Sequence, residues 1–173
     1  EQVPKESAIF VSNHQSSLDL FLVGRVIGTQ PHVWLGKAGL LKYPLLGRLM
    51  NHSAIPVYFD GKQHPSVVQV AVKKLQKGFS VGLFPESTRS TDDNIHHFYT
   101  GFAAMAKLSG KPVVPVFIQG VYKVLAPKAR ILGWGTLSAK VGAPFVFKPN
   151  ETVQAFADRV RQWFVFQQSS ATT

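Results

Sequence analysis

Short apolar runs along this chain alternate with segments whose apolar residues recur at helical spacing. Each short run is bounded by polar residues, glycine or proline, which is typical of a buried strand. The runs predict strands at Ala8–Val11, His32–Gly36, Ala54–Phe59, Ser80–Phe84, Pro112–Gln119, Leu137–Val141 and Pro144–Phe147.

Between these runs, apolar residues three and four positions apart predict amphipathic helices. The predicted helices are Ser16–Ile27, Ser66–Gln76, Gly101–Ser109 and a final helix capped by Asn150. The apolar segment Leu40–Met50 contains Pro44 and Gly47, so we expect a broken helix or a helical loop there. We expect Glu86–His97 to be a polar loop and Gln167–Thr173 to be a frayed tail.

The alternation of strands and helices through the first two thirds of the chain predicts an α/β fold. We expect one domain, 1–173, built on a mostly parallel mixed sheet with helices on both faces, since no linker or internal repeat interrupts the chain. Ligands of such sheets gather at the carboxyl ends of the strands. Two polar motifs follow strands there, Asn13–His14 and Glu86–Arg89.

The charge balance is strongly basic, with 19 Lys and Arg against 9 Asp and Glu and a net charge of +10. This sign favours anionic partners such as nucleic acid, phosphorylated metabolites or an acidic membrane surface. No acidic residue lies between Asp93 and Glu151, although a solvated face explains such a stretch equally well. The absence of cysteine excludes disulfides, thiol nucleophiles and cysteine metal sites.

No segment has the run of about 18 apolar residues that a membrane span needs. The chain opens at Glu1 without an initiator methionine, only a few residues before its first apolar run. We therefore expect the whole protein to carry an N-terminal membrane-anchoring segment before this domain.

A histidine and an aspartate stand five positions apart in Asn13–Asp19. If Ser16 caps the following helix, Asp19 lies in its first turn and its carboxylate can reach back to His14. A carboxylate on Nδ1 leaves Nε2 as a proton acceptor, so the pair would act as a general base on a hydroxyl. The alternative is a capping box formed by Ser16 and Asp19, which needs no catalysis.

The second motif, Phe84–Ser90, offers groups for an anionic substrate. Arg89 can grip a phosphate, Ser87 and Thr88 can donate hydrogen bonds, and Glu86 can hold a hydroxyl or position Arg89. The alternative is a surface loop with a weak Glu86–Arg89 ion pair.

Three further features of the sequence bear on its function. Lys37, which follows a predicted strand, suits an anionic group, although an ordinary surface lysine explains it as well. Adjacent His96 and His97 point apart and have no third ligand at a familiar spacing, so we expect a solvated loop and no metal. The sequence has no G-x-S-x-G, P-loop or dinucleotide-binding glycine motif.

Taken in order, these motifs resemble the glycerolipid acyltransferase superfamily, specifically the 1-acylglycerol-3-phosphate acyltransferases of the PlsC type. Asn13–Asp19 matches the family motif N-H-x-S-x-x-D, Lys37 matches the family lysine, and Pro44–Gly47 matches P-x-x-G. Phe84–Arg89 matches F-P-E-G-T-R, Phe98–Gly101 matches F-x-x-G, and Pro112–Val116 matches the V-P-V-like strand. The resemblance covers roughly Ile9 to Phe117.

The chain departs from the family pattern at two places. Ser87 replaces a glycine that permits a positive φ. Tyr58-Phe59 stands where the family tends to have Asp-Arg, whose arginine is thought to help hold the acceptor phosphate. Phosphate recognition would then depend on Lys37 and Arg89, and a different or non-phosphate lysolipid acceptor stays open as an alternative.

The resemblance implies acyl transfer from acyl-CoA or acyl-carrier protein to the free hydroxyl of a lysolipid acceptor, most simply lysophosphatidic acid. His14 would be the base and Asp19 would orient it. Glu86, Ser87, Thr88, Arg89 and Lys37 would bind the acceptor. Val113, Val114 and Pro115 would line the acyl pocket, although ordinary core is the alternative for each. A thioester is already activated, so no metal or redox cofactor is expected.

The same resemblance implies an enzyme of phospholipid biosynthesis that works on an anionic membrane surface, at its cytoplasmic face. Tyr122–Trp134 mixes basic and apolar residues and is expected to touch lipid, the alternative being a loop with a short strand. A nucleic-acid-binding module would share the charge but lacks the sequence signals of one, so we expect no nucleic acid. An inactive lipid-binding member of the same fold is the remaining alternative.

Overall fold

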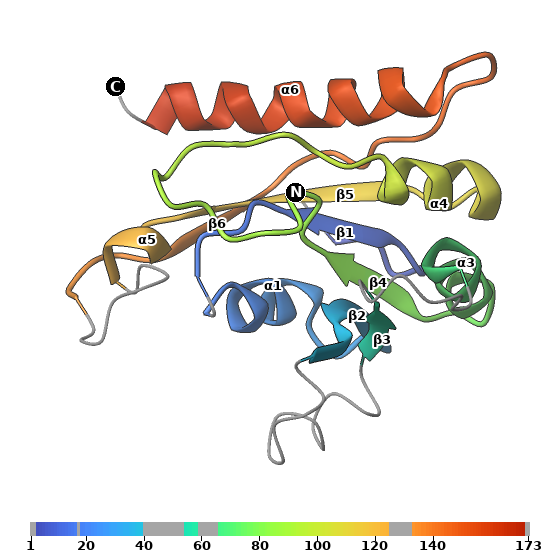
Figure 1. The fold of residues 1–173 in the computed structure, drawn as a ribbon, viewed down its shortest axis with the longest axis horizontal. Helices are drawn as coiled ribbons and strands as arrows, with labels where there is room; N and C mark the ends of the chain where they lie inside the picture. Colours follow the sequence, from blue (N-terminus) through green and yellow to red (C-terminus); the bar gives the residue numbers. More distant parts are fainter. Residues whose placement is uncertain (1–2, 17, 40–53, 59–65, 125–132, 172–173) are drawn as a thin grey trace.

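The computed structural model describes residues 3–16, 18–39, 54–58, 66–124 and 133–171. Within these residues a six-stranded sheet has the order β3-β2-β4-β1-β5-β6 (Figure 1). All neighbouring strands are parallel except β5 and β6. The strands are β1 Ile9–Ser12, β2 His32–Lys37, β3 Ala54–Val57, β4 Ser80–Leu83, β5 Val113–Gln119 and β6 Ser138–Val141. The helices are α1 Asp19–Ile27, α3 Val67–Gln76, α4 Gly101–Ser109, α5 Val121–Val124 and α6 Val153–Ala171.

The strand β1 lies at the centre of the sheet, between β4 and β5. Ile9 pairs in parallel with Val81 of β4 and with Val113 of β5. Every residue of β1 is buried, because helices cover both faces, and Ile9, Phe10 and Val11 therefore form a continuous apolar run instead of an alternating pattern. The polar residues from Asn13 onward thus emerge at the carboxyl edge of the sheet, beside the segment that leaves β4.

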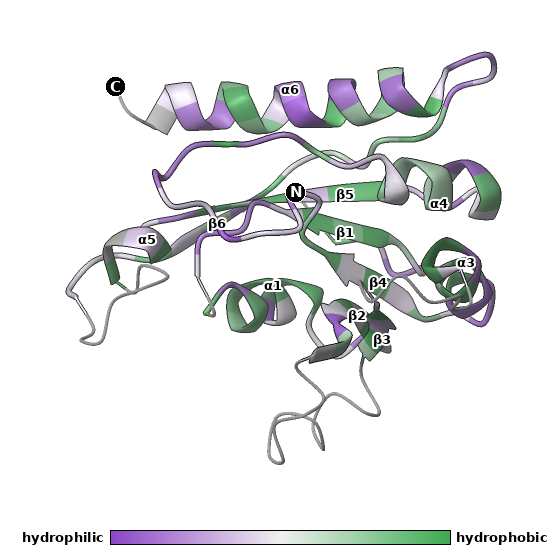
Figure 2. Ribbon diagram, in the orientation of Figure 1, coloured by the Kyte–Doolittle hydropathy of each residue, from purple (hydrophilic) through white to green (hydrophobic). Residues whose placement is uncertain are grey.

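Helices cover both faces of the sheet, as the sequence predicts. α3, α4 and α6 pack on one face and α1 packs on the other (Figure 1). Figure 2 shows β1 and β5 as hydrophobic along their lengths, whereas α6 alternates between hydrophobic and hydrophilic positions. Leu75, Phe102 and Phe164 belong to the first core cluster, and Phe10 and Val23 belong to the second. The predicted α/β fold with a mostly parallel sheet is confirmed.

Two predictions about the C-terminal part are wrong. Pro144–Phe147 is not a strand, because only Phe145 forms an isolated bridge, to Val113. Asn150 does not cap the last helix: it has a φ of +64°, and the cap hydrogen bond runs from the N–H of Ala155 to Oγ1 of Thr152 at 3.1 Å. The chain therefore makes one more turn before the helix begins.

The ends of two helices also differ from the sequence prediction. α1 begins at Asp19 instead of Ser16. α6 continues through Ala171, so the predicted frayed tail is helical as far as that residue. The predicted helical loop Leu40–Met50, Phe59 and most of Tyr122–Trp134 lie outside the described residues.

Candidate active site

The side chains of His14 and Asp19 meet at the carboxyl edge of the sheet. Nδ1 of His14 lies 2.8 Å from Oδ2 of Asp19. An ionised carboxylate only accepts hydrogen bonds, so this contact puts the imidazole proton on Nδ1 and the lone pair on Nε2. Within the described residues Nε2 has no hydrogen-bond partner, and the His14 side chain is 19% exposed while that of Asp19 is fully buried. The predicted contact between these two residues is present.

The same oxygen of Asp19 also holds the turn between β1 and α1. Oδ2 accepts the N–H of Gln15 at 2.6 Å and the N–H of Ser16 at 2.8 Å. The bond from Ser16 is one half of a capping box; the other half is missing, because Oγ of Ser16 accepts the N–H of Leu18 at 3.3 Å. The sequence leaves two interpretations of Asp19 open, capping the turn and orienting the histidine. One oxygen of Asp19 makes both sets of contacts, so both interpretations apply.

Glu86 joins the two sequence motifs through the backbone. Its Oε1 accepts the N–H of His14 at 3.1 Å, and its Oε2 accepts the N–H of His96 at 3.3 Å. Glu86 is 5% exposed. Burial raises its pKa above the ordinary 4.5, although both backbone hydrogen bonds act in the opposite direction. Glu86 therefore connects the turn that contains His14 to the loop that contains His96. Its expected contact with an acceptor hydroxyl stays a prediction.

The segment after Glu86 turns outward and then returns to His14. Ser87 has a φ of +60°, so a serine here adopts the left-handed conformation that glycine would adopt more easily. Ser87, Thr88 and Arg89 are exposed. The next N–H, that of Ser90, donates to the carbonyl oxygen of His14 at 2.7 Å. Arg89 is thus held one residue from a direct contact with the backbone of His14.

Lys37 and the predicted acyl-pocket residues take different places in the fold. Lys37 is the last residue of β2 and lies exposed at the same carboxyl edge as His14. Val113, Val114 and Pro115 lie inside β5, and all three are buried. Val113 packs in one core cluster and Val114 in the other, so they face opposite sides of the sheet. A pocket on one face would therefore contact only one of these two valines, and the acyl-pocket role of these residues stays a prediction.

A stack of aromatic rings behind His14 escaped the sequence prediction. The Phe84 ring lies parallel to the imidazole, with centroids 4.0 Å apart and planes at 13°. Trp34 of β2 stacks on the other side of Phe84 at 5.9 Å. Gly82 makes room for it, because a Cβ there would lie 2.7 Å from Cζ3 of Trp34. The stack fixes the plane of the imidazole, as Asp19 fixes its edge.

Asn13 begins the first sequence motif, and the structure gives its side chain a role. Its Nδ2 donates to the carbonyl oxygen of Ile118 at 2.9 Å, and its Oδ1 accepts the N–H of Ile118 at 2.8 Å. The side chain thus continues the pairing of β1 with β5 beyond the end of β1. An asparagine after a buried strand is a weak signal for this, since the partner is 105 positions away in the sequence.

A second His–Asp contact lies in the loop that follows Arg89. Nε2 of His96 is 2.8 Å from Oδ1 of Asp92, and the two side chains are 47% and 51% exposed. Oγ of Ser90 lies 3.3 Å from the same nitrogen, so the three residues cannot relay a proton from one ring nitrogen to the other. Hydrogen bonds from Asn94, chiefly, hold the pKa of Asp92 well below its usual range. The predicted solvated loop at His96 is confirmed.

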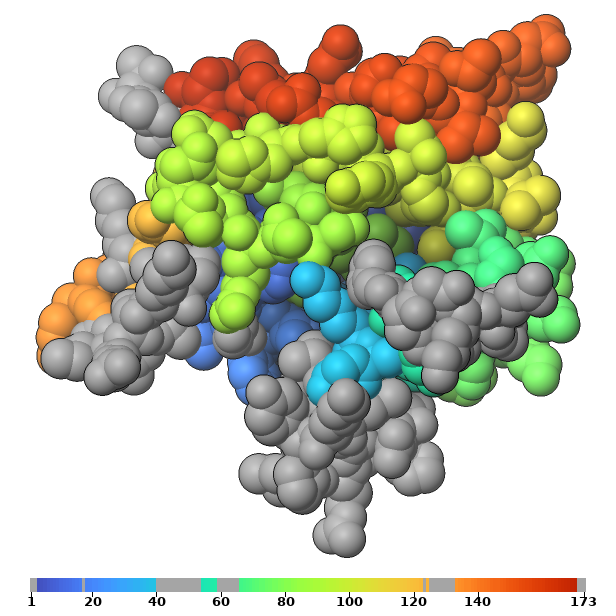
Figure 3. Space-filling view, in the orientation of Figure 1, coloured from blue at the N-terminus to red at the C-terminus, as the bar shows by residue number. Residues whose placement is uncertain are grey.

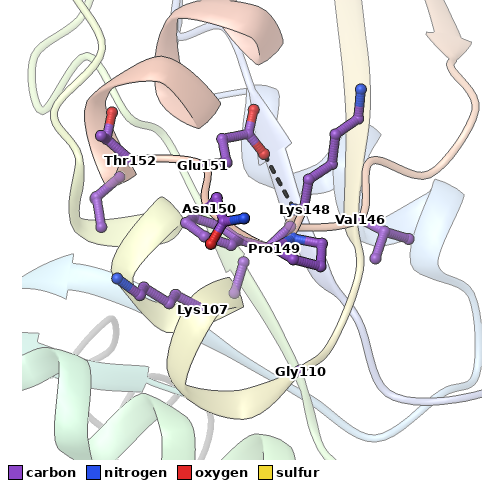
Figure 4. A pocket seen from close by; sticks show the side chains of 11 residues that line it. Lys107, Gly110, Val146, Lys148, Pro149, Asn150, Glu151 and Thr152 are labelled. Atoms are coloured by element: carbon purple, nitrogen blue, oxygen red, sulfur yellow. Dashed lines mark hydrogen bonds between the residues drawn. The ribbon is translucent and has the colours of Figure 1, made fainter.

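A cavity of about 670 Å³ lies away from these residues. Figure 4 shows Lys107 and Gly110 of the α4 end beside Lys148, Asn150 and Glu151 before α6. Gly110 precedes β5, so this cavity is at the edge where the strands begin, opposite His14. None of the predicted site residues lines it.

No group of three or more His, Asp or Glu side chains among the described residues could hold a metal ion. Of the helices in this part of the chain, none combines the length and the apolar character that crossing a bilayer requires.

Residues 1–119 match a family model described as Acyltransferase. The 1-acyl-sn-glycerol-3-phosphate acyltransferase of Limnanthes douglasii is 36% identical over 124 residues, which cover 68% of this chain and 43% of that protein. The Saccharomyces cerevisiae protein of the same name is 29% identical over 178 residues, covering 95% of this chain and 56% of that protein. The chain spans 34% and 39% of the lengths of the chloroplastic relatives from Brassica napus and Arabidopsis thaliana.

The fold has a solved counterpart. The crystal structure of the 1-acyl-sn-glycerophosphate (LPA) acyltransferase PlsC from Thermotoga maritima matches with a TM-score of 0.80 at 24% identity. The match covers 99% of this chain and 69% of that one. At this identity the likeness concerns the fold.

Proposed function

The chain belongs to the acyltransferase family, as its motifs indicate, and on this premise we propose that it transfers a fatty acyl group from a thioester to the free hydroxyl of lysophosphatidic acid. The observation that carries the proposal is the 2.8 Å contact of His14 Nδ1 with the buried Asp19, which leaves Nε2 as an acceptor. The products would be phosphatidic acid and a free thiol.

The chemical step needs one base and one polarised carbonyl. Nε2 of His14 takes the proton of the acceptor hydroxyl, and the oxygen attacks the thioester carbonyl carbon. The C–S bond of the resulting tetrahedral intermediate breaks, and the thiolate leaves with the proton from His14. Asp19 stabilises the imidazolium that exists between these two transfers. The ring need not move, because Asp19 and Phe84 hold its edge and its face.

The basic residues at the same edge suit an anionic acceptor. Arg89 and Lys37 would bind its phosphate, with Ser87 and Thr88 as additional donors. Arg89 follows Ser87 and Thr88 in a turn tied to His14 by the Ser90 N–H, so a phosphate there would lie near the base. The acyl donor would be acyl-CoA or acyl-carrier protein.

A second acceptor class is favoured by one observation. Tyr58 is 42% exposed just beyond β3, and no arginine follows it where the family tends to have one. An aromatic ring there suits a less anionic headgroup. The alternative function is therefore acyl transfer to a zwitterionic or neutral lysolipid.

The experiment that tests both is an acceptor panel with one acyl-CoA and a thiol-release assay. Lysophosphatidic acid, glycerol-3-phosphate, a zwitterionic lysolipid and a neutral one are offered to the wild type and to His14→Ala. We expect turnover with lysophosphatidic acid that His14→Ala abolishes. If His14→Ala keeps most of the activity, the mechanism is wrong; if only the uncharged or zwitterionic acceptors react, the second class is correct.

We infer that the enzyme works on an anionic bilayer, from the acid-free stretch between Asp93 and Glu151. Basic residues near such a surface contribute about 1 kcal/mol each. In that stretch Lys107, Lys140 and Lys148 are exposed. Flotation with vesicles that contain or lack anionic lipid tests the inference, and equal recovery with both would contradict it.

A further inference from the structure

The last helix of the chain reaches the candidate active site. α6 starts beside the cavity at the far edge of the sheet and runs back towards the edge that carries His14 (Figure 1). Its C-terminal half lies along the loop that follows Glu86. Figure 3 shows the red atoms of α6 running directly along the yellow-green atoms of this loop.

One stripe of α6 binds the loop segment Asp93–His96. Nε of Arg161 donates to the carbonyl oxygen of His96 at 2.8 Å, and its Nη2 donates to that of Ile95 at 3.2 Å. About two turns further along, Nε2 of Gln168 donates to the carbonyl oxygen of Asp93 at 2.6 Å, and its Oε1 accepts the N–H of Ile95 at 3.3 Å. Each contact is made to the backbone of the loop, so it fixes the path of the loop and not one side chain.

An aromatic contact between these two polar ones closes the interface. Phe164 lies between Arg161 and Gln168 on the same stripe, and its ring meets that of Phe98 at 5.2 Å. Phe164 and Phe98 are both almost fully buried, and Ile95 is 7% exposed. The loop thus packs on α6 through apolar side chains, and the hydrogen bonds of Arg161 and Gln168 lie on either side of this apolar contact.

The segment that α6 holds is connected to His14 and Asp19 by two routes. The N–H of His96 donates to Oε2 of Glu86, whose Oε1 accepts the N–H of His14. The second route starts at Asp93, whose Oδ1 accepts a hydrogen bond from Nε2 of Gln15. The backbone N–H of Gln15 in turn donates to Oδ2 of Asp19. A shift of the loop would therefore reach both the histidine and its aspartate.

The loop needs such support because it has no regular secondary structure of its own between Glu86 and Thr100. Asp93 also has a φ of +62°, a left-handed conformation that is unfavourable for a residue with a Cβ. Such a conformation persists where the surroundings hold it. Gln168 binds the carbonyl oxygen of that same residue.

We propose that Arg161 and Gln168 are positioning residues of the acyl transfer, and that α6 belongs to the active site although the match to the family model ends at residue 119. Arg161 and Gln168 hold the backbone of Asp93–His96. This segment holds Glu86 and Gln15, and these two residues in turn hold His14 and Asp19. The inference rests on the proposed function, since the step it supports is proton removal by His14.

The experiment compares Arg161→Ala, Arg161→Lys and Gln168→Ala with the matched control Arg159→Ala. Arg159 lies on the same helix but binds Glu151, at 2.8 and 2.9 Å, near the far edge of the sheet. We expect Arg161→Ala to lower kcat about tenfold or more, because small displacements of a reacting group are costly, while KM for the acyl donor changes less than about twofold. Lysine can still donate to one carbonyl oxygen, so Arg161→Lys should recover kcat to within about threefold of the wild type.

A second measurement reports on the loop itself and does not need turnover. Hydrogen exchange at the amides of Ile95 and His96 should speed up in Arg161→Ala and Gln168→Ala, with no change in β1 and β4. Arg159→Ala should leave kcat and this exchange unchanged, although it removes a salt bridge and lowers the melting temperature.

The two failures are distinguishable. If the wild type transfers no acyl group to any acceptor, the proposed function fails, and the exchange data still test whether α6 holds the loop. If the wild type is active and Arg161→Ala and Gln168→Ala match Arg159→Ala in kcat and in amide exchange, the positioning role is overturned.

Discussion

Replacing Asp19 with asparagine separates its structural role from the catalytic role that we propose for it. Oδ2 accepts hydrogen bonds from His14 and from the N–H groups of Gln15 and Ser16, whereas Oδ1 is buried without a partner among the described residues. The two backbone donors require an acceptor at the position of Oδ2. The asparagine oxygen should therefore take that place, and its NH2 group should take the place of Oδ1.

The expected loss of kcat follows from the loss of the negative charge of Asp19. In the proposed mechanism an imidazolium forms beside the carboxylate in the transition state. With the charge centres about 4 Å apart and an effective dielectric constant of about 20, the two charges attract by about 4 kcal/mol. Since about 1.36 kcal/mol corresponds to a factor of ten, Asp19→Asn should lower kcat about a thousandfold. The fold should survive, because the two backbone bonds keep a neutral acceptor, with a loss of about 1–2 kcal/mol in the free energy of unfolding.

The assay measures thiol release with saturating acyl-CoA and lysophosphatidic acid, together with the urea unfolding of each variant. Asp92→Asn is the matched control, because Asp92 makes a contact of the same 2.8 Å length with His96 but is 51% exposed. Its kcat should stay within about twofold of the wild type, as expected for an exposed pair. Asp19→Ala is expected to be much less stable than Asp19→Asn, since it leaves two buried N–H groups without an acceptor.

Two outcomes would refute the reasoning about Asp19. A folded Asp19→Asn protein that keeps more than about a tenth of wild-type kcat has lost too little for an ion pair worth about 4 kcal/mol. An equal loss in Asp92→Asn would mean that any His–Asp contact in this region matters, and that the buried one is not special.

Three further predictions concern the surroundings of His14. Ser87→Gly should raise the free energy of unfolding by about 0.5–1 kcal/mol, since glycine accepts the φ of +60° more easily; a higher KM for the acceptor in that variant would show that the Ser87 hydroxyl binds substrate. Gly82→Ala should lower stability by about 1–3 kcal/mol and alter the near-ultraviolet circular dichroism of Trp34, because its Cβ would lie 2.7 Å from that ring; an unchanged spectrum would contradict the stack. Burial raises the pKa of Glu86 above its ordinary 4.5. Between pH 4.5 and this raised pKa, Glu86 keeps its proton in the folded protein and has lost it in the unfolded chain, so the free energy of unfolding should fall as the pH rises through this range. Glu86→Gln should remove this slope in urea unfolding measured across that pH range.

The sequence predicts the centre of the sheet well because β1, β4 and β5 are buried on both faces. The run Val113–Ile118 is apolar throughout, and no helix or exposed loop accommodates such a run as easily. The errors lie where the pattern is weak. Phe145 and Phe147 alternate like a strand, but they pack as side chains of an extended loop beside β5. Asparagine is a common helix-capping residue, which favours Asn150, but Thr152 lies next to the first helical turn and accepts the capping hydrogen bond.

The candidate site is predictable only where its members are close in sequence. The distance of five positions between His14 and Asp19 confines the two side chains to one turn, so their contact could be expected. The contacts of Trp34 and Arg161 could not, since each depends on how a distant strand or helix packs. Trp34 stands in an apolar strand, where any large residue would fit the pattern, and Arg161 stands on a polar helix face, where any charge would.

The turn between β1 and α1 shows why the motif has this spacing. Asp19 opens α1, so its carboxylate points back over the preceding turn, where the N–H groups of Gln15 and Ser16 converge on Oδ2. These bonds form as the chain folds, and they restrict the rotation of the carboxylate before any substrate arrives. His14 therefore meets an acceptor whose position is already set, and its own backbone is fixed by Glu86 and by the Ser90 N–H. Moving the aspartate one position further would turn its side chain about 100° around the helix axis and away from both amides. A capping geometry is thus the condition for orienting His14 as the proposed base, and a sequence that lost the capping geometry would also lose the orientation of the imidazole.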